Sequence, residues 1–142
     1  MPSSDWISLA GGLISLIGVG VIWIQTEKLS EQLLMQHFSD YTKRYQEIIL
    51  QFPEDINKKE FVLRGRDDYE KTMRHMRAYI DLCYEEWYLN RRGLIDPEIW
   101  RIWEAGVQTA FSKPAFKQAW EIVKSDSNFG KQFEAFIEKC IQ

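Results

Sequence analysis

The feature that most constrains this chain is its first apolar run, Trp6 to Ile24, which has 19 residues and no charged side chain. A helix rises about 1.5 Å per residue, so about 20 residues cross a hydrocarbon core that is about 30 Å thick. The run therefore predicts a transmembrane anchor over residues 1–26. Trp6 and Trp23 stand at its two ends, where indole rings favour the lipid–water interface.

The alternative for this run is a cleaved secretory signal peptide. The preceding segment, MPSSD, has no Lys or Arg, and no A-x-A-like cleavage site follows the run, so we favour an uncleaved anchor. All 18 Lys and Arg residues lie after the run. The positive-inside rule then predicts an N-terminus outside the membrane and a cytoplasmic domain over residues 27–142.

Small residues form a stripe within the predicted anchor. They recur in steps of four, three, four and three, at Ser4, Ser8, Gly11, Ser15 and Gly18. Small side chains let helix backbones approach closely in lipid, so the stripe favours self-association or docking on another membrane protein. The other interpretation is that Gly and Ser are simply common in membrane helices. Besides such a protein, the expected partner is membrane lipid.

The next helical segment is Glu27 to Phe52, which contains no Pro or Gly and is either continuous with the anchor or separate from it. Its apolar residues repeat at helical spacing and predict a buried seam, which either packs within the chain or extends the anchor's stripe into an oligomer. This seam consists of Leu34, Phe38, Tyr41, Tyr45, Ile48 and Phe52. Pro53 ends the segment, and a charged connector follows over residues 53–65, with one short helical turn expected around Lys59 to Val62.

Four further helices are predicted after the connector. The longest, Asp67 to Arg92, carries an apolar stripe at Tyr69, Met73, Met76, Ile80, Cys83 and Trp87. Asp96 caps the next helix with Pro97 at its first position, and two shorter helices cover about 114–125 and 129–141. The predicted fold class is therefore all-α, with one N-terminal transmembrane helix followed by an antiparallel helical bundle of about five helices.

The chain offers few residues for chemistry. Cys83 and Cys140 occupy apolar faces and are predicted to be buried, reduced thiols. His37 and His75 have no second ligand at a metal-binding spacing, and no Arg–His spacing of the HEPN nuclease kind is present. We therefore predict no catalytic residue, cofactor, metal or small-molecule substrate. The part after the anchor is nearly neutral, which gives no case for broad nucleic-acid binding.

Two groups of side chains nevertheless stand out. Arg77, Asp81 and Glu85 are four apart and share one helix face, where they form either a polar site or, as we favour, an ion-pair ladder against a neighbouring helix. Large rings gather around the turn at 93–96, and we favour a core built from them over an exposed interaction face. They are Tyr84, Trp87, Tyr88, Trp100, Trp103 and Trp120.

The segment from Met76 to Trp120, with MRAYIDLCYEEWYLNRRGLIDPEIWRIWEAG and then KPAFKQAWE, resembles a family of uncharacterised bacterial proteins. In that family an N-terminal anchor precedes a small helical domain of unknown function, and residues 82–103 carry the resemblance best. The layout is also similar to membrane accessory proteins of some RNA-targeting CRISPR systems. The resemblance implies a location in the bacterial inner membrane and transfers no catalytic residue.

These observations lead to one functional expectation and one alternative. We expect a single-pass, membrane-anchored helical protein that acts by assembly, as a homo-oligomer or as a small accessory subunit of a membrane complex. The alternative is a membrane-tethered enzyme or nucleic-acid effector, for example in phage defence, that uses the polar face around Arg77, Asp81 and Glu85.

Overall fold

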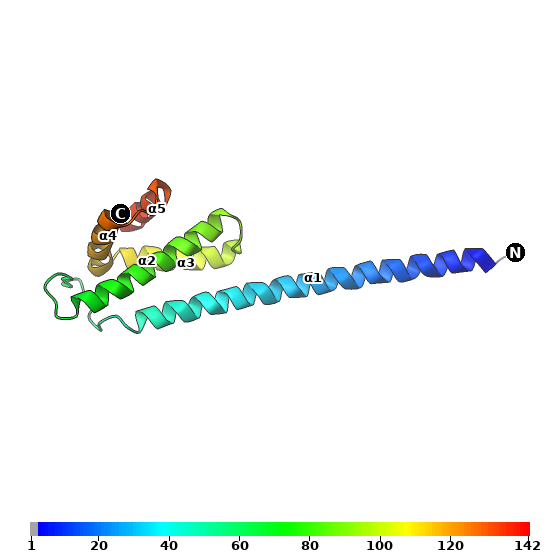
Figure 1. Cartoon of the computed structure of the whole chain (residues 1–142), viewed down its shortest axis with the longest axis horizontal. Coiled ribbons are helices and arrows are strands. Elements are labelled where there is room, and N and C mark those ends of the chain that lie inside the picture. The colour runs from blue at the N-terminus through cyan, green and yellow to red at the C-terminus, as the bar shows by residue number, and fades with distance from the viewer. Residues whose placement is uncertain (1–2) are drawn as a thin grey trace. The chain divides into compact units, whose positions relative to one another are not determined.

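The computed structural model describes the backbone of residues 3–142 and the side chains of residues 21–142, and this part of the chain is entirely helical, with no strand. Its five helices are α1 (Ser3–Ile49), α2 (Tyr69–Arg91), α3 (Pro97–Phe111), α4 (Pro114–Asp126) and α5 (Lys131–Ile141), as Figure 1 shows. The prediction of an all-α fold is confirmed.

The chain separates into two compact units, Met1–Ser39 and Asp40–Gln142. Within the first unit, the described side chains of α1 from Val21 onward are largely exposed, and Leu34 and Phe38 are half-buried. The second unit contains residues 40–49 of α1, the connector and helices α2 to α5. It forms the helical bundle.

The predicted transmembrane helix requires a correction. Across residues 21–142, whose side chains are described, no helix is long and apolar enough to cross a membrane. The part of α1 whose side chains are described begins with four consecutive apolar residues, at 21–24, before the polar sequence Gln25, Thr26, Glu27 and Lys28. Charged groups this close to the apolar residues make burial in hydrocarbon costly.

Most of the residues predicted to pack or anchor a membrane helix lie outside the described side chains. These are Ser4, Trp6, Ser8, Gly11, Ser15 and Gly18. Trp23, the other predicted interface residue, lies within the described part of α1 and is 65% exposed.

The core of the bundle lies between α2, α3, α4 and α5. Helix α2 packs against α3 and α4, and α3 packs against α4 and α5. Trp120 of α4 is fully buried, and the rings of Phe111 and Phe133 meet it edge-on at centroid distances of 6.3 and 6.0 Å. From α2, Met76 and Ile80 complete this core, as the spacing of the stripe predicted. The stripe buries apolar area, which stabilises the bundle.

Local sequence signals explain where several helices end. Asp96 caps α3, since its Oδ1 accepts hydrogen bonds from the backbone N–H of Glu98 at 2.8 Å and of Ile99 at 3.3 Å, and Pro97 takes the first helical position. Gly93 has a φ of 68° just after α2, a conformation that suits glycine. The predicted cap is therefore confirmed.

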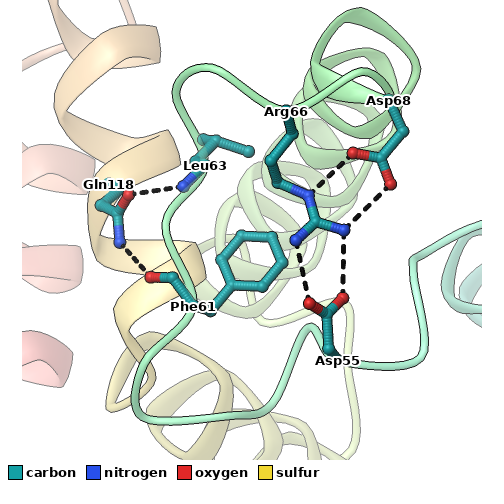
Figure 2. Close-up of polar contacts among 6 residues, drawn as sticks. All are labelled: Asp55, Phe61, Leu63, Arg66, Asp68 and Gln118. Atoms are coloured by element: carbon teal, nitrogen blue, oxygen red, sulfur yellow. Dashed lines mark hydrogen bonds and ion pairs between the residues drawn. The ribbon is translucent and has the colours of Figure 1, made fainter.

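The connector between α1 and α2 contains a hydrogen-bonded turn close to the one predicted around Lys59 to Val62, in which the Phe61 N–H donates to the Lys58 carbonyl at 3.2 Å. Side chains hold the residues that follow this turn. Gln118 of α4 accepts a hydrogen bond from the Leu63 backbone N–H and donates one to the Phe61 carbonyl, both at 2.9 Å (Figure 2). This side chain thereby supplies partners to backbone groups that the turn itself leaves unpaired.

Arg66 fixes the same connector to the start of α2. Its guanidinium donates to Asp55 at 2.9 and 3.2 Å and to Asp68 at 2.8 and 3.2 Å, and it lies 4.7 Å from the centre of the Phe61 ring (Figure 2). Asp68 precedes α2 but makes no side-chain cap, because its carboxylate binds Arg66. The guanidinium lowers the pKa of Asp68 and thereby keeps this ion-pair network charged.

Candidate functional site

The three residues of the predicted polar face do not form one site. Arg77 binds Asp126 at the end of α4, with its Nη1 atom 2.7 Å from Oδ1 and its Nη2 atom on Oδ2. Glu85 instead binds Arg44 of α1 at 2.6 Å. Within residues 21–142, no hydrogen bond or ion pair joins Arg77, Asp81 and Glu85 to one another. Each of the two end members ties α2 to a different helix.

Asp81, the middle member, is exposed between these two pairs. Partial desolvation raises its pKa, the charge of Arg77 opposes that rise, and the charge of Glu85 adds to it. A single carboxylate supplies at most two oxygen ligands, whereas a divalent cation requires several more. Over the described side chains, no group of three or more His, Cys, Asp or Glu residues is placed to hold a metal ion.

The most unusual titratable group is Glu86, which sequence reasoning did not single out. It is only 7% exposed although it carries a carboxyl group. Burial raises the pKa of Glu86 to about 8, with Arg44 lowering the value and Glu85 raising it further. Glu86 is therefore largely protonated in the folded protein at neutral pH.

A signal for Glu86 is present in the sequence. Thr72, Tyr79 and Glu86 are seven residues apart and all three are buried. They form a second row beside the apolar stripe of α2, and the sequence prediction covers only the apolar members of that helix face. A carboxyl that continues a heptad row of buried residues is a candidate for burial in its neutral form.

Glu86 interacts electrostatically with side chains of α1 and α2, among them Tyr41, Arg44 and Tyr79. Tyr41 of α1 is buried against Trp103, with ring centroids 4.9 Å apart, and Arg44 lies 5.6 Å from the centre of the Tyr41 ring. Burial, with a contribution from the charges of Glu85 and Glu86 and opposed by Arg44, raises the pKa of Tyr41 to about 12. Burial also raises the pKa of Tyr79 well above its usual value. Both phenols therefore remain neutral at ordinary pH.

Both cysteines are free and buried, as predicted. Burial raises the pKa of the Cys83 thiol well above its usual value and that of Cys140 to about 11. Because the thiolate is the reactive form, these two residues are poor nucleophiles. The Cys83 side chain serves the core of the bundle.

The predicted aromatic group divides into buried and exposed members. Trp120 lies in the centre of the core, and Tyr84, Trp87, Trp100 and Trp103 are half-buried at its edges. Tyr88 is 45% exposed. The favoured interpretation of a ring-built core therefore holds for Trp120, while Tyr88 faces solvent at the end of α2.

A cavity of about 360 Å³ lies where the end of α1 meets α2, α3 and α4. Aromatic rings form much of its wall, including those of Tyr45, Phe52, Tyr79 and Phe116. The one cation in its lining, Lys113, donates a hydrogen bond from Nζ to Oδ1 of Asn57 at 2.7 Å. Polar and apolar groups therefore contribute to the wall of this cavity in similar measure.

No family model, no curated protein and no solved structure matches this chain. The resemblance of residues 76–120 to anchored bacterial helical proteins therefore stays a prediction.

Proposed function

We propose that this protein acts by assembly, in which α1 pairs in parallel with α1 of a second copy along a seam of Ile22, Thr26, Leu29 and Leu33. The observation that carries the proposal is the exposure of these apolar residues: Ile22 is 64%, Leu29 is 56% and Leu33 is 49% exposed. The four positions follow one another in steps of four, three and four residues, which is the spacing of a two-stranded coiled-coil seam.

Thr26 suits an apolar seam despite its hydroxyl group. Its Oγ1 donates a hydrogen bond to the carbonyl of Ile22 at 2.8 Å, one turn earlier in the same helix. The hydroxyl hydrogen is thereby satisfied within the helix. Burial of Thr26 between two copies of α1 therefore leaves no hydrogen-bond donor without a partner, and the Thr26 methyl group adds to the apolar surface.

The residues that flank the seam favour pairing between identical chains. Gln25, Ser30 and Gln32 occupy the flanking positions and carry no charge. The charged residues Glu27 and Glu31 fall on the outer side of the helix, together with Lys28. In a parallel coiled coil the flanking positions of the two strands face each other, so these uncharged residues cause no repulsion between copies.

The energetics are compatible with a stable pair. Full burial of a Leu or Ile side chain contributes about 1.5–3 kcal/mol, and two copies bring six such side chains to the seam. Association costs about 4–15 kcal/mol in lost translational and rotational freedom. The apolar burial is of the size needed to offset this cost. A helix without tertiary packing is only marginally stable in water, which further favours pairing.

The mass of the full chain in solution tests this proposal. We expect sedimentation at micromolar concentration to give a dimer or higher oligomer, and Leu29→Asp combined with Leu33→Asp to give a monomer. Met35→Asp is the control, because Met35 is an apolar residue of α1 off the seam that is even more exposed than Leu29 and Leu33, and it should leave the mass unchanged. A wild-type monomer, or an oligomer that survives the double substitution, overturns the proposal.

The parallel arrangement has its own test. A cysteine in place of Leu29 should form a disulfide with the same position of the second copy under oxidising conditions. A cysteine in place of Glu31, on the outer side of the helix, should not. The buried native thiols leave these reactions to the introduced residues. Cross-linking at residue 31 in preference to residue 29 would place the contact on the other side of α1.

A further inference from the structure

The second half of α2 and the start of α5 enclose a hollow of about 500 Å³. Its lining combines two kinds of side chain, aromatic rings and cations, and contains no carboxylate. The lining residues are Tyr84, Trp87, Tyr88, Arg91, Arg92, Phe129, Gly130, Lys131 and Gln132. The volume lies in the range that accommodates a small organic ligand.

Among the described side chains, the three cations of this hollow have no ion-pair partner, unlike several other cations of the bundle. Arg44, Arg66 and Arg77 each bind a carboxylate. Over residues 21–142, by contrast, no carboxylate lies within ion-pair distance of Arg91, Arg92 or Lys131, the three cations that line the hollow. Three positive charges without counter-ions around one concave surface attract an anion, and two of them are guanidinium groups that suit phosphate oxygens.

The backbone at the start of α5 adds to this positive potential. Gly130 precedes the helix with a φ of 82° and provides no side-chain cap, so the first-turn N–H groups from Lys131 onward lack a side-chain partner. The N-terminal end of a helix carries a partial positive charge. Glu134 is the acidic residue of that first turn, and it does not line the hollow.

The rings of the hollow provide a surface for a planar group. Tyr84 stacks on Tyr88 with ring centroids 6.3 Å apart and an interplanar angle of 26°, and on Trp87 at 5.9 Å and 30°. Arg91 lies 5.2 Å from the centre of the Trp87 ring, and Arg92 donates to the Tyr88 hydroxyl at 3.3 Å. Tyr88 is the most exposed of the three rings, so its ring is open to a ligand, with Arg92 on its hydroxyl group and Arg91 on the neighbouring Trp87 ring.

We propose that this hollow binds a nucleoside phosphate, whose base stacks on Tyr88 and whose phosphate is held by Arg91, Arg92 and Lys131. A planar ring joined to an anion matches a lining that consists of aromatic rings and unpaired cations. Stacking of a base on an aromatic side chain contributes about 1–3 kcal/mol. A free nucleotide and a nucleotide within a single strand share this chemistry.

Calorimetric titration of the full chain with adenosine 5′-monophosphate tests the proposal. We expect saturable binding, with adenosine and inorganic phosphate each binding at least tenfold more weakly than the nucleotide. Arg91→Gln combined with Arg92→Gln should weaken nucleotide binding at least tenfold, as should Tyr88→Ala. The control is Arg74→Gln, because Arg74 is an exposed arginine of the same helix outside the hollow, and it should leave the affinity unchanged.

A single-stranded oligonucleotide distinguishes the two sources of the ligand. Tighter binding of the oligonucleotide that is lost in Tyr88→Ala and in the double arginine variant supports the site and assigns it to a strand. Absence of saturable nucleotide and oligonucleotide binding overturns the proposal, as does binding that the double variant leaves unchanged while circular dichroism shows each variant folded. These residues lie apart in sequence from the seam of α1, so loss of binding and loss of assembly are separately measurable.

Discussion

The Nη1 atom of Arg44 lies 2.6 Å from Oε2 of Glu85, and this ion pair joins the last part of α1 to α2. Both side chains are about half-exposed, so the pair itself contributes on the order of 0.2–1 kcal/mol to stability. Its greater consequence concerns the next residue, Glu86, which is buried and interacts with both charges. This arrangement makes stability depend on pH.

We expect the free energy of unfolding to fall as pH rises from about 4.5 to about 8. Glu86 has an ordinary pKa of 4.5 when unfolded and about 8 when folded. Between these values the folded chain retains a proton that the unfolded chain has lost, so a rise in pH favours unfolding by up to about 1.4 kcal/mol per pH unit. Urea denaturation followed by circular dichroism across this range measures the slope.

Three substitutions isolate the contribution of Glu86. Glu86→Gln should flatten the slope, because the amide does not titrate. Arg44→Gln should move the upper end of the affected range to higher pH, since Arg44 lowers the pKa of Glu86 in the folded protein, and Glu85→Gln should move that end to lower pH. The other groups that face Glu86, Tyr41, Tyr79 and Cys83, have pKa values raised above this range. An unchanged slope in Glu86→Gln would refute this assignment.

A second prediction concerns the partner of Arg77. A double-mutant cycle on Arg77 and Asp126 should give a coupling of about 0.2–1 kcal/mol, because the pair is bidentate but partly exposed. The same cycle on Arg77 and Asp81 should give a smaller coupling, since no hydrogen bond or ion pair between these two is found within residues 21–142. Chemical denaturation of the single and double variants measures both values, and a larger coupling to Asp81 than to Asp126 would contradict the interhelical pair as the main partner of Arg77.

The contrast between Asp81 and Asp126 shows what the sequence could and could not predict. Four-residue spacing correctly places Arg77, Asp81 and Glu85 along α2, but any such spacing is also compatible with partners on other helices. The helix packing decides that Arg77 meets Asp126, 49 residues later, and that Glu85 meets Arg44, 41 residues earlier. Periodicity and caps define helices locally, whereas partners across the bundle depend on tertiary packing.

A third prediction tests the fixation of the connector. Gln118→Ala should destabilise the protein by about 1–3 kcal/mol, because the Leu63 N–H and the Phe61 carbonyl lose their partner next to buried side chains. Gln108→Ala is the matched control, since Gln108 is an exposed glutamine of α3, and it should change stability by less than about 0.5 kcal/mol. Equal effects of the two substitutions in urea denaturation would contradict a structural role for Gln118.

The last prediction concerns Trp120, which has no exposed surface and joins α4 to the rings of Phe111 and Phe133. Trp120→Ala should cost about 3–5 kcal/mol, because the removed indole leaves a cavity among side chains that relax only partly. Trp120→Phe retains a ring and should cost less, about 1–3 kcal/mol. Far-UV circular dichroism in urea measures both, since this signal does not depend on the tryptophan that is removed.

The polar end of Trp120 allows a finer test of the same residue. Its Nε1–H donates a hydrogen bond to Oε1 of Glu138 at 3.2 Å, and Lys124 donates to the same oxygen at 2.8 Å. In Trp120→Phe the carboxylate keeps Lys124 and partial access to water, so most of the cost should come from lost volume. Glu138→Gln in the Trp120→Phe background should therefore add less than Trp120→Phe itself. Because that background already lacks the Trp120 donor, a larger effect at Glu138 would mean that the Lys124–Glu138 ion pair, more than ring packing, holds α5 on α4.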